Sequence, residues 1–305
     1  SEGYLVRLTD EAWWVVNEAS GWKYYGLTAG YASGYIGDIW NGTGINKVPF
    51  ATDVNATLVG DLISGRYGAA PASSATHGYI ALGIAAPTNT VIQKFSFVSE
   101  GTAVAGGTMP TAGLYWAGGT MSETHGYVMG GLSGSPITAI NKYPFAADDN
   151  ATAIANLSVA SHGHKMVSTP EYALTFPGTA SEAYQKFTFV SEADTTTTSW
   201  LSPGGGSNNA TASAEYGYNC RNTSPSSFYK NSFASEATAT LAGSLTVHRV
   251  YANAGLSSDL SGYCTGGGGP ASNFNIIEKW PFSADNNATD VGDLTSLARS
   301  QQGNH

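Results

Sequence analysis

The sequence predicts an all-β fold, a six-bladed β-propeller, and three observations lead to this prediction. An eleven-residue motif, KVPFATDVNAT, recurs as KYPFAADDNAT and KWPFSADNNAT, and three weaker copies fill the gaps. The copies follow one another at intervals of 44 to 49 residues, which is typical of a repeat architecture. Short apolar runs alternate with turn-rich clusters, and no segment keeps the 3.6-residue apolar period of a helix. The six copies begin at Lys47, Lys94, Lys142, Lys186, Lys230 and Lys279.

Each repeat contains two strand signals. The first is a marker in which a Gly stands beside an aromatic residue, as in THGYIALG from Thr76 to Gly83. The second is a strand such as VIQKFSF, with an apolar residue two before the Lys and a Phe three after it. Because successive side chains point to opposite faces, both faces of this strand require burial. A sheet of about four strands packed between two like sheets meets this requirement, as a propeller blade does. The recurrent Phe residues are Phe50, Phe97, Phe145, Phe189, Phe233 and Phe282.

The two ends of the chain predict how the ring closes. The last repeat ends in residues 293–305 before its marker, whereas the first four residues, SEGY, look like a marker. We therefore expect pairing of the N- and C-terminal segments to close the ring and remove free sheet edges. Residues 1–22 are expected to be an extra strand at this seam or an attachment to a larger assembly, and residues 23–305 the propeller. In the first repeat we expect the marker at Tyr25, which leaves Gly34 to Asn41 as an insertion.

Composition and charge exclude several classes of function. The chain has 305 residues, 42% of them hydrophobic, which is enough for a folded core. Only 11% are charged and the formal net charge is -9, so the clustered cations that bind nucleic acid are missing. No apolar run approaches the roughly 20 residues that span a bilayer, so membrane insertion is not expected. The sequence begins at Ser1 and shows no signal-peptide pattern.

The two cysteines, Cys220 and Cys264, occupy nearly matching places in successive repeats. They differ by one position in register, which on a strand means opposite faces. This offset favours two buried free thiols, with a disulfide as the alternative.

The repeats resemble those of kelch-type β-propellers in the Gly-rich marker, the aromatic strand and the xIxKFxF strand. A closer similarity, over about residues 24 to 300, is to kelch-like repeat arrays of bacteriophage structural proteins, often from aquatic phages. Those arrays repeat THGY, IxKFxF and DxNATDVGDL, which match Thr76–Tyr79, Thr124–Tyr127 and Asn287–Leu294 here. The fourth repeat departs from the pattern, with Tyr172-Ala173 in place of His-Gly. The resemblance implies repeat architecture in a virion protein more than it implies an activity.

The sequence contains no catalytic constellation. It lacks a G-x-S-x-G elbow, an H-E-x-x-H motif and a phosphate-binding loop, so no enzyme activity is expected. His162 and His164 are the best metal candidates, because residues two apart on a strand share a face, but no third ligand accompanies them. The Asp-rich turns, such as that at Asp53, suit ordinary turn chemistry, with bound calcium as the alternative. No other cofactor is expected.

Three tryptophans are candidates for carbohydrate binding. Exposed aromatic rings near polar side chains hold sugar rings by stacking and hydrogen bonding. Trp40 and its neighbour Asn41 lie in the irregular segment SGYIGDIWNG, whereas Trp116 and Trp200 lie beside Gly-rich stretches. Trp116 and Trp200 also align with aromatic strand positions such as Tyr67, which favours burial in the core for both over a binding role.

We therefore predict a non-enzymatic recognition propeller of a virion, on a tail fibre or a capsid surface. Its expected partners are other virion proteins or host-surface glycans, and its expected location is the virion surface or the extracellular space. The first alternative is a secreted, lectin-like propeller, which glycans on the repeated Asn-Ala-Thr turns would favour. The second is an enzyme that acts on polysaccharide or depends on a metal.

Overall fold

The structure, a computed structural model, describes most of the chain, and the described residues form strands, turns and bends without a helix. In this part of the chain there is accordingly no helix of the length and apolarity that crosses a membrane. The described ranges are 4–8, 12–17, 21–23, 33–37, 42–66, 68–83, 90–178, 183–198, 207–221, 226–235, 237–249, 254–269, 272–298 and 302–304.

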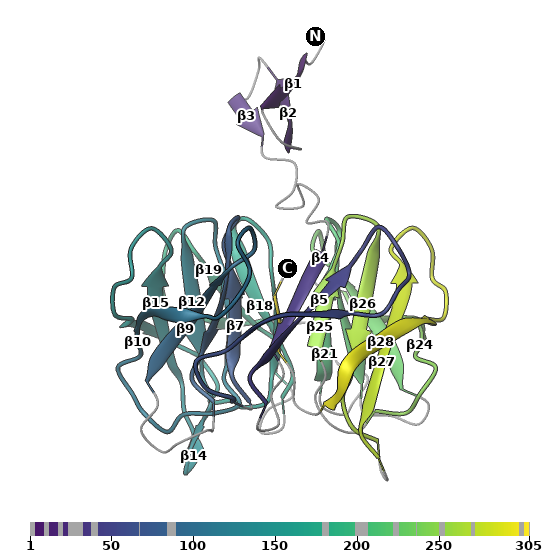
Figure 1. The fold of residues 1–305 in the computed structure, drawn as a ribbon. Helices are drawn as coiled ribbons and strands as arrows, with labels where there is room; N and C mark the ends of the chain where they lie inside the picture. The colour runs from purple at the N-terminus through teal and green to yellow at the C-terminus, as the bar shows by residue number, and fades with distance from the viewer. Residues whose placement is uncertain are drawn as a thin grey trace.

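Six four-stranded antiparallel sheets form the blades of a ring, which confirms the predicted six-bladed β-propeller (Figure 1). Blade 1 contains β29 (Gln302–Asn304), β4 (Ser33–Gly37), β5 (Gly44–Pro49) and β6 (Thr57–Asp61). Blade 2 contains β7 (Ala70–Ser73), β8 (His77–Ala81), β9 (Val91–Ser96) and β10 (Val104–Thr108). Blade 3 contains β11 (Gly118–Met121), β12 (His125–Met129), β15 (Ala139–Pro144) and β16 (Thr152–Asn156), with a hairpin of β13 (Leu132–Ser133) and β14 (Ser135–Pro136) after β12.

The remaining blades follow the same order. Blade 4 contains β17 (Lys165–Ser168), β18 (Tyr172–Phe176), β19 (Gln185–Thr188) and β20 (Thr196–Thr197). Blade 5 contains β21 (Ser207–Ala212), β22 (Tyr216–Arg221), β23 (Ser227–Ser232) and β24 (Thr240–Ser244). Blade 6 contains β25 (Ala254–Ser257), β26 (Ser261–Thr265), β27 (Phe274–Pro281) and β28 (Thr289–Ala298).

The innermost strands of the blades contact one another in turn around the centre of the ring. A Cβ atom on Gly119 of β11 would lie 2.2 Å from the backbone oxygen of Pro71 on β7. A Cβ atom on Gly255 of β25 would lie 2.0 Å from the backbone oxygen of Ala210 on β21. Neighbouring inner strands therefore approach to a distance that only glycine allows.

The C-terminal strand closes the ring, as predicted, by pairing with a strand of the first repeat. Gln302 of β29 lies opposite Gly37 of β4, and Asn304 lies opposite Tyr35. The expected partner was wrong, because Tyr4 of the SEGY segment pairs with Val16 instead. Gly34 to Gly37 is thus part of a blade strand and not an insertion. Several Gly-aromatic pairs near the N-terminus fit the marker, and only strand pairing distinguishes them.

A separate three-stranded antiparallel sheet precedes the propeller and stands apart from the ring in Figure 1. It contains β1 (Tyr4–Leu8), β2 (Ala12–Asn17) and β3 (Gly21–Lys23). The first described strand of the ring begins at Ser33, and Tyr25 lies outside the described residues. A role of this sheet in attachment stays a prediction.

Aromatic stacking between blades accounts for the recurrent Phe. Phe97 of blade 2 stacks on Tyr35 of blade 1, with ring centroids 4.7 Å apart. Phe50 of blade 1 stacks in the same way on Tyr263 of blade 6, also at 4.7 Å. The stacking between blades therefore continues across the point where the ring closes. The marker tyrosine of one blade is therefore the partner of the motif Phe of the next. The other stacked pairs of this kind are Tyr79–Phe145, Tyr127–Phe189 and Tyr218–Phe282.

Ion pairs between blades explain why the motif carries both a Lys and an acid. Each paired Lys reaches the turn of the following blade, at N–O distances of 2.5 to 2.8 Å. Lys279 of blade 6 bonds Asp53 of blade 1, which continues the series across the seam. The Asp-rich turns are therefore engaged by cations of the same chain. The other pairs are Lys47–Glu100, Lys94–Asp148, Lys142–Glu192 and Lys230–Asp285.

Cys220 and Cys264 are both free and buried, as predicted. Although they differ by one position in register, both belong to one core cluster. Opposite faces of successive blades face each other across the interface between them.

Candidate functional site

The best-formed candidate site lies on one face of the ring, which we call the loop face. Strands alternate in direction within a blade, so those loops before innermost strands that the structure describes open on one side. The hairpin of β13 and β14 follows a second strand and opens on this side too, at the bottom of Figure 1. The described part of the loop face includes residues 62–66, 68–69, 109–117 and 157–164.

Trp116 occupies a backbone position at which two other blades have glycine. Gly68, Trp116 and Gly163 each stand two residues before an innermost strand, and all three have positive φ, of 66°, 54° and 66°. The Trp116 N–H donates to the Gly68 oxygen at 2.6 Å, and the Gly163 N–H donates to the Trp116 oxygen at 2.8 Å. A left-handed conformation costs a non-glycine residue about 1–2 kcal/mol, which these two bonds help to offset. Residues held in such conformations cluster at binding and active sites.

The Trp116 side chain forms a platform with His162. The two rings are stacked, with centroids 5.8 Å apart and an interplanar angle of 16°. Tyr115 meets the Trp116 ring edge-on at 5.2 Å. Of the Trp116 surface 39% is exposed, so the expectation of a core tryptophan, which the alignment favoured, is wrong for this residue. We call the stacked Trp116 and His162 the aromatic platform.

Gly68 makes room for the platform from the neighbouring blade. A Cβ atom at this position would lie 2.4 Å from Trp116 Cδ1, far inside van der Waals contact. Because Gly68 also has a positive φ, both space and backbone conformation require glycine there. The ring position of Trp116 is therefore defined by three successive loops.

Burial keeps both histidines of this loop neutral near pH 7. It lowers the pKa of His162 below the ordinary value of 6.5. The pKa of His164, which is 3% exposed, falls to about 4 because of burial first and the nearby positive charges of Lys165 and His162 second. Burial also lowers the pKa of Lys165, the first residue of β17, to about 8.

The two histidines do not form a metal site with other described residues. They lie in the loop before β17 and not on a strand, so the prediction that they share a strand face is wrong. His162 stacks on Trp116, whereas His164 is buried against Gly118 and Gly130. Within the described ranges no group of three His, Cys, Asp or Glu side chains could hold a metal ion.

The other predicted ligand-binding residues, Trp40, Asn41 and Trp200, lie outside the described residues. The prediction for these three stays open. Trp116 is thus the predicted candidate whose surroundings the structure describes.

Sequence reasoning missed a set of buried polar residues that hold the loop-face loops. Each stands directly before a motif Lys and is at most 3% exposed. Gln93 Oε1 accepts the Ser64 N–H at 3.2 Å, and its Nε2 donates to the Ser64 oxygen at 3.0 Å. Gln185 makes the same two bonds to Val159, at 3.1 and 2.9 Å. The sequence contains a pattern that could have identified this set, because a polar residue precedes the Lys in five of the six copies. These residues are Asn46, Gln93, Asn141, Gln185 and Glu278.

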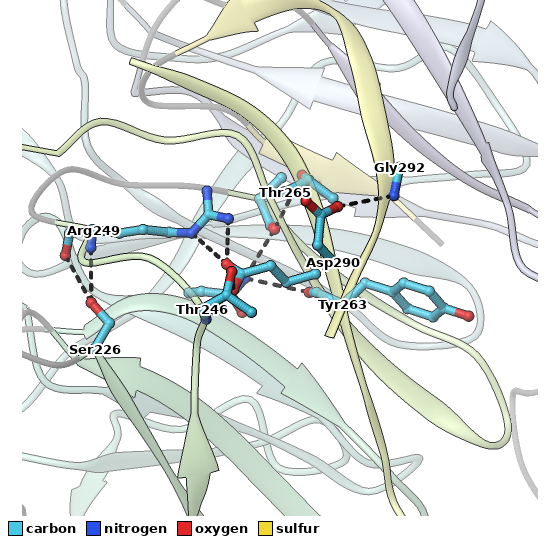
Figure 2. A network of polar contacts seen from close by, with 10 residues as sticks. Ser226, Thr246, Arg249, Tyr263, Thr265, Asp290 and Gly292 are labelled. Carbon is cyan, nitrogen blue, oxygen red and sulfur yellow. Dashed lines mark hydrogen bonds and ion pairs between the residues drawn. The ribbon is translucent and has the colours of Figure 1, made fainter. Parts of the chain in front are cut away.

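In blade 6 this position carries a charge, and Figure 2 shows the resulting network. Glu278 Oε2 accepts from Arg249 Nε at 2.9 Å, and Oε1 accepts from the Thr246 hydroxyl at 2.6 Å. The Arg249 backbone N–H donates to Ser226 Oγ at 2.8 Å. Both charged side chains are at most 1% exposed, so this pair organises the loop before β25 and does not face solvent.

Comparisons with known proteins support the fold. No protein family matches the sequence, and no curated protein matches it either. Among solved structures, the chain is similar to the one titled "Structure of YjhT", with a TM-score of 0.63 and 12% sequence identity. The match covers 77% of this chain and 86% of that chain. At this identity the likeness shows a shared propeller fold alone, so kelch-type and phage membership stay predictions.

Proposed function

We propose that this chain is a non-enzymatic recognition propeller of a virion and binds host-surface glycans on its loop face. The observation that carries the proposal is the aromatic platform, a 39% exposed tryptophan that neighbouring loops hold in a left-handed conformation. A sugar ring presents C–H groups that stack on such a ring, and nearby polar groups then orient its hydroxyls. Placement on a virion rests on the resemblance of the repeats to phage arrays.

Preorganisation of the platform supports a binding role. The Trp116 backbone is tied to both neighbouring blades, and Gly68 and His162 confine its ring. A side chain that is already ordered loses little conformational entropy when a ligand binds. The ordered platform can therefore bind a ligand tightly even though the contact area is small.

The secreted, lectin-like alternative would use the same platform and is distinguished by glycosylation. The Asn-Ala-Thr turns already have a structural role, since Asn150 Oδ1 accepts from the Thr108 N–H at 3.1 Å and from its hydroxyl at 2.7 Å. Asn287 accepts the Ser244 N–H at 3.1 Å in the same way. These bonds account for the repeated turn through Oδ1, whereas an N-glycan is attached at Nδ2, so mass analysis for glycans separates the two proposals.

The first test is a binding screen of the purified chain against host-type glycans and bacterial polysaccharides. Trp116→Ala is expected to weaken binding about tenfold or more, because stacking on an aromatic ring contributes about 1 kcal/mol beyond buried area. The matched control is Leu260→Ala, which removes a 78% exposed apolar side chain in the β25–β26 turn on the opposite face. Equal binding by both variants and the parent would reject the platform.

Two further readouts separate the alternatives. Product analysis of every bound polysaccharide detects cleavage or modification, which would favour an enzyme. Repetition of the screen after dialysis against a chelator identifies a required metal. Absence of binding across the whole panel would instead favour a structural role defined by protein contacts.

A further inference from the structure

The two cysteines form a second chemical feature, at the interface between blades 5 and 6. Cys220 lies on β22 of blade 5 and Cys264 on β26 of blade 6, at 1% and 0% exposure. Both pack in one core cluster with Phe228 and Trp280. Both side chains therefore lie at the interface between these two blades.

The one-residue register offset is what brings them together. Cys220 stands three residues after the marker Gly217, and Cys264 stands two residues after the marker Gly262. Equivalent positions in successive blades point the same way around the ring, so two residues of opposite parity point either toward or away from each other. Their shared core cluster shows that these two point toward each other. A zero offset would have placed both thiols on the same side of their blades.

Backbone contacts fix the two strands at the same level. Cys220 pairs with Asn209 in blade 5, and Cys264 pairs with Gly255 in blade 6. The Asn209 side-chain amide donates to the Ala254 oxygen at 2.9 Å and to the Tyr263 oxygen at 3.5 Å. These acceptors are the chain neighbours of Gly255 and Cys264, so the bonds hold the two cysteine-bearing sheets together at the level of the thiols.

We propose that Cys220 and Cys264 form a reversible disulfide that staples blade 5 to blade 6. The co-reactant is a small-molecule disulfide such as oxidised glutathione. One protein thiolate attacks it, a mixed disulfide forms and one small thiol leaves. The second protein thiol then attacks the mixed disulfide and releases the second small thiol. Two S–H bonds and one small-molecule S–S bond are lost, and one protein S–S bond and two small thiols are formed.

The folded interface controls when this exchange takes place. Burial raises the pKa of the Cys220 thiol, so little reactive thiolate is present in the closed state. Exchange is therefore expected during folding or during local opening between the two blades. Once formed, the bond is protected from reductant by the same burial. The proposal is independent of glycan binding.

The test follows the oxidation state of the full chain through refolding. Reduced protein is unfolded in guanidinium and refolded either with a mixture of reduced and oxidised glutathione or with reductant alone. Each sample is alkylated in denaturant, weighed intact and digested without reduction. We expect two alkylated thiols after the reducing arm, none after the glutathione arm, and a Cys220–Cys264 linked peptide in the latter. The glutathione arm should also unfold at a higher temperature until reductant is added under denaturing conditions.

Cys220→Ala provides the matched control, since it should show the same unfolding temperature in both arms. The parent protein gives a complete result even if this variant folds poorly. Two free thiols in the glutathione arm, stable glutathione adducts on both cysteines, or disulfides only between separate chains would each overturn the proposal.

Discussion

At the scale of single residues, Trp116 combines backbone strain with exposure. A tryptophan stands where Gly68 and Gly163 stand in the neighbouring loops, and its ring lies on the surface. The covered part of the ring packs against Gly68, Tyr115 and His162. This combination of strain and exposure is the basis of the proposed glycan site.

Gly68→Ala tests the platform without removing it. The new methyl group would lie 2.4 Å from Trp116 Cδ1, so the indole must move and glycan affinity should fall about tenfold. Gly101→Ala is the matched control, because Gly101 also has a positive φ, of 88°, but its Cβ would meet nothing within 4 Å. Titration of both variants with a ligand from the screen checks the result. Equal losses would assign the effect to backbone strain alone.

His164→Leu tests a pH effect at the residue scale. The unfolded chain protonates His164 below about pH 6.5, whereas the buried residue resists protonation until about pH 4. The unfolded state then binds more protons in this window, so the free energy of unfolding falls as the pH falls. Between pH 7 and pH 4.5, His164 should lower the free energy of unfolding by about 2 to 3 kcal/mol. The variant should lack this decrease. Urea unfolding at both pH values measures the difference, and an unchanged pH slope would contradict it.

At the scale of elements, the motif strand is a connector between blades. Its Phe and Lys contact neighbouring blades, and the polar residue before the Lys holds the loop that precedes the blade's innermost strand. These contacts differ in burial. The Lys–acid pairs lie near the surface, whereas the Arg249–Glu278 pair is enclosed.

This difference predicts unequal effects of removing one acid. Glu278→Ala leaves Arg249 buried without its carboxylate and should destabilise the protein by about 3–5 kcal/mol. Asp148→Ala removes the partner of Lys94 at a site where the Asp148 side chain is 50% exposed, and should change stability by at most about 1 kcal/mol. Urea unfolding of both variants at neutral pH provides the measurement. Similar losses would mean that burial does not govern these pairs.

At the scale of the whole molecule, three β29 residues complete a blade that otherwise begins about 270 residues earlier in the chain. Without β29, the inner edge of β4 has unpaired backbone groups beside β7 and β25. Ring closure therefore couples the C-terminus to the stability of the entire propeller.

Truncation should destabilise the propeller at the C-terminal end of the chain and leave its stability unchanged at the N-terminal end. Deletion of residues 302–305 removes β29 and should lower the unfolding temperature by several degrees and promote aggregation through the exposed edge. Deletion of residues 1–23 removes the separate sheet of β1, β2 and β3 and should leave the unfolding of the propeller unchanged. Calorimetry and light scattering of both chains check this. A large loss on N-terminal deletion would show that the sheet supports the ring.

Much of the architecture could be predicted because it is written in a repeated pattern. The spacing of the six lysines and the alternation around Phe97 or Phe145 predict blades, since both follow from local strand geometry. The site was predicted less well. Trp116 was recognised as a candidate, but His162 and Gly68 were not assigned to it, because they come from two other loops.

The sequence by itself determined the all-β class, the number of blades and the apolar positions, because these depend on periodic patterns that recur in every repeat. Only the tertiary structure decided which Gly-Tyr pair closes the ring, which acid each Lys meets and whether the two thiols face each other. It also decided that Trp116 is exposed in a left-handed turn. These properties depend on how one blade packs on the next, and contacts between residues about 45 positions apart leave no local pattern in the chain.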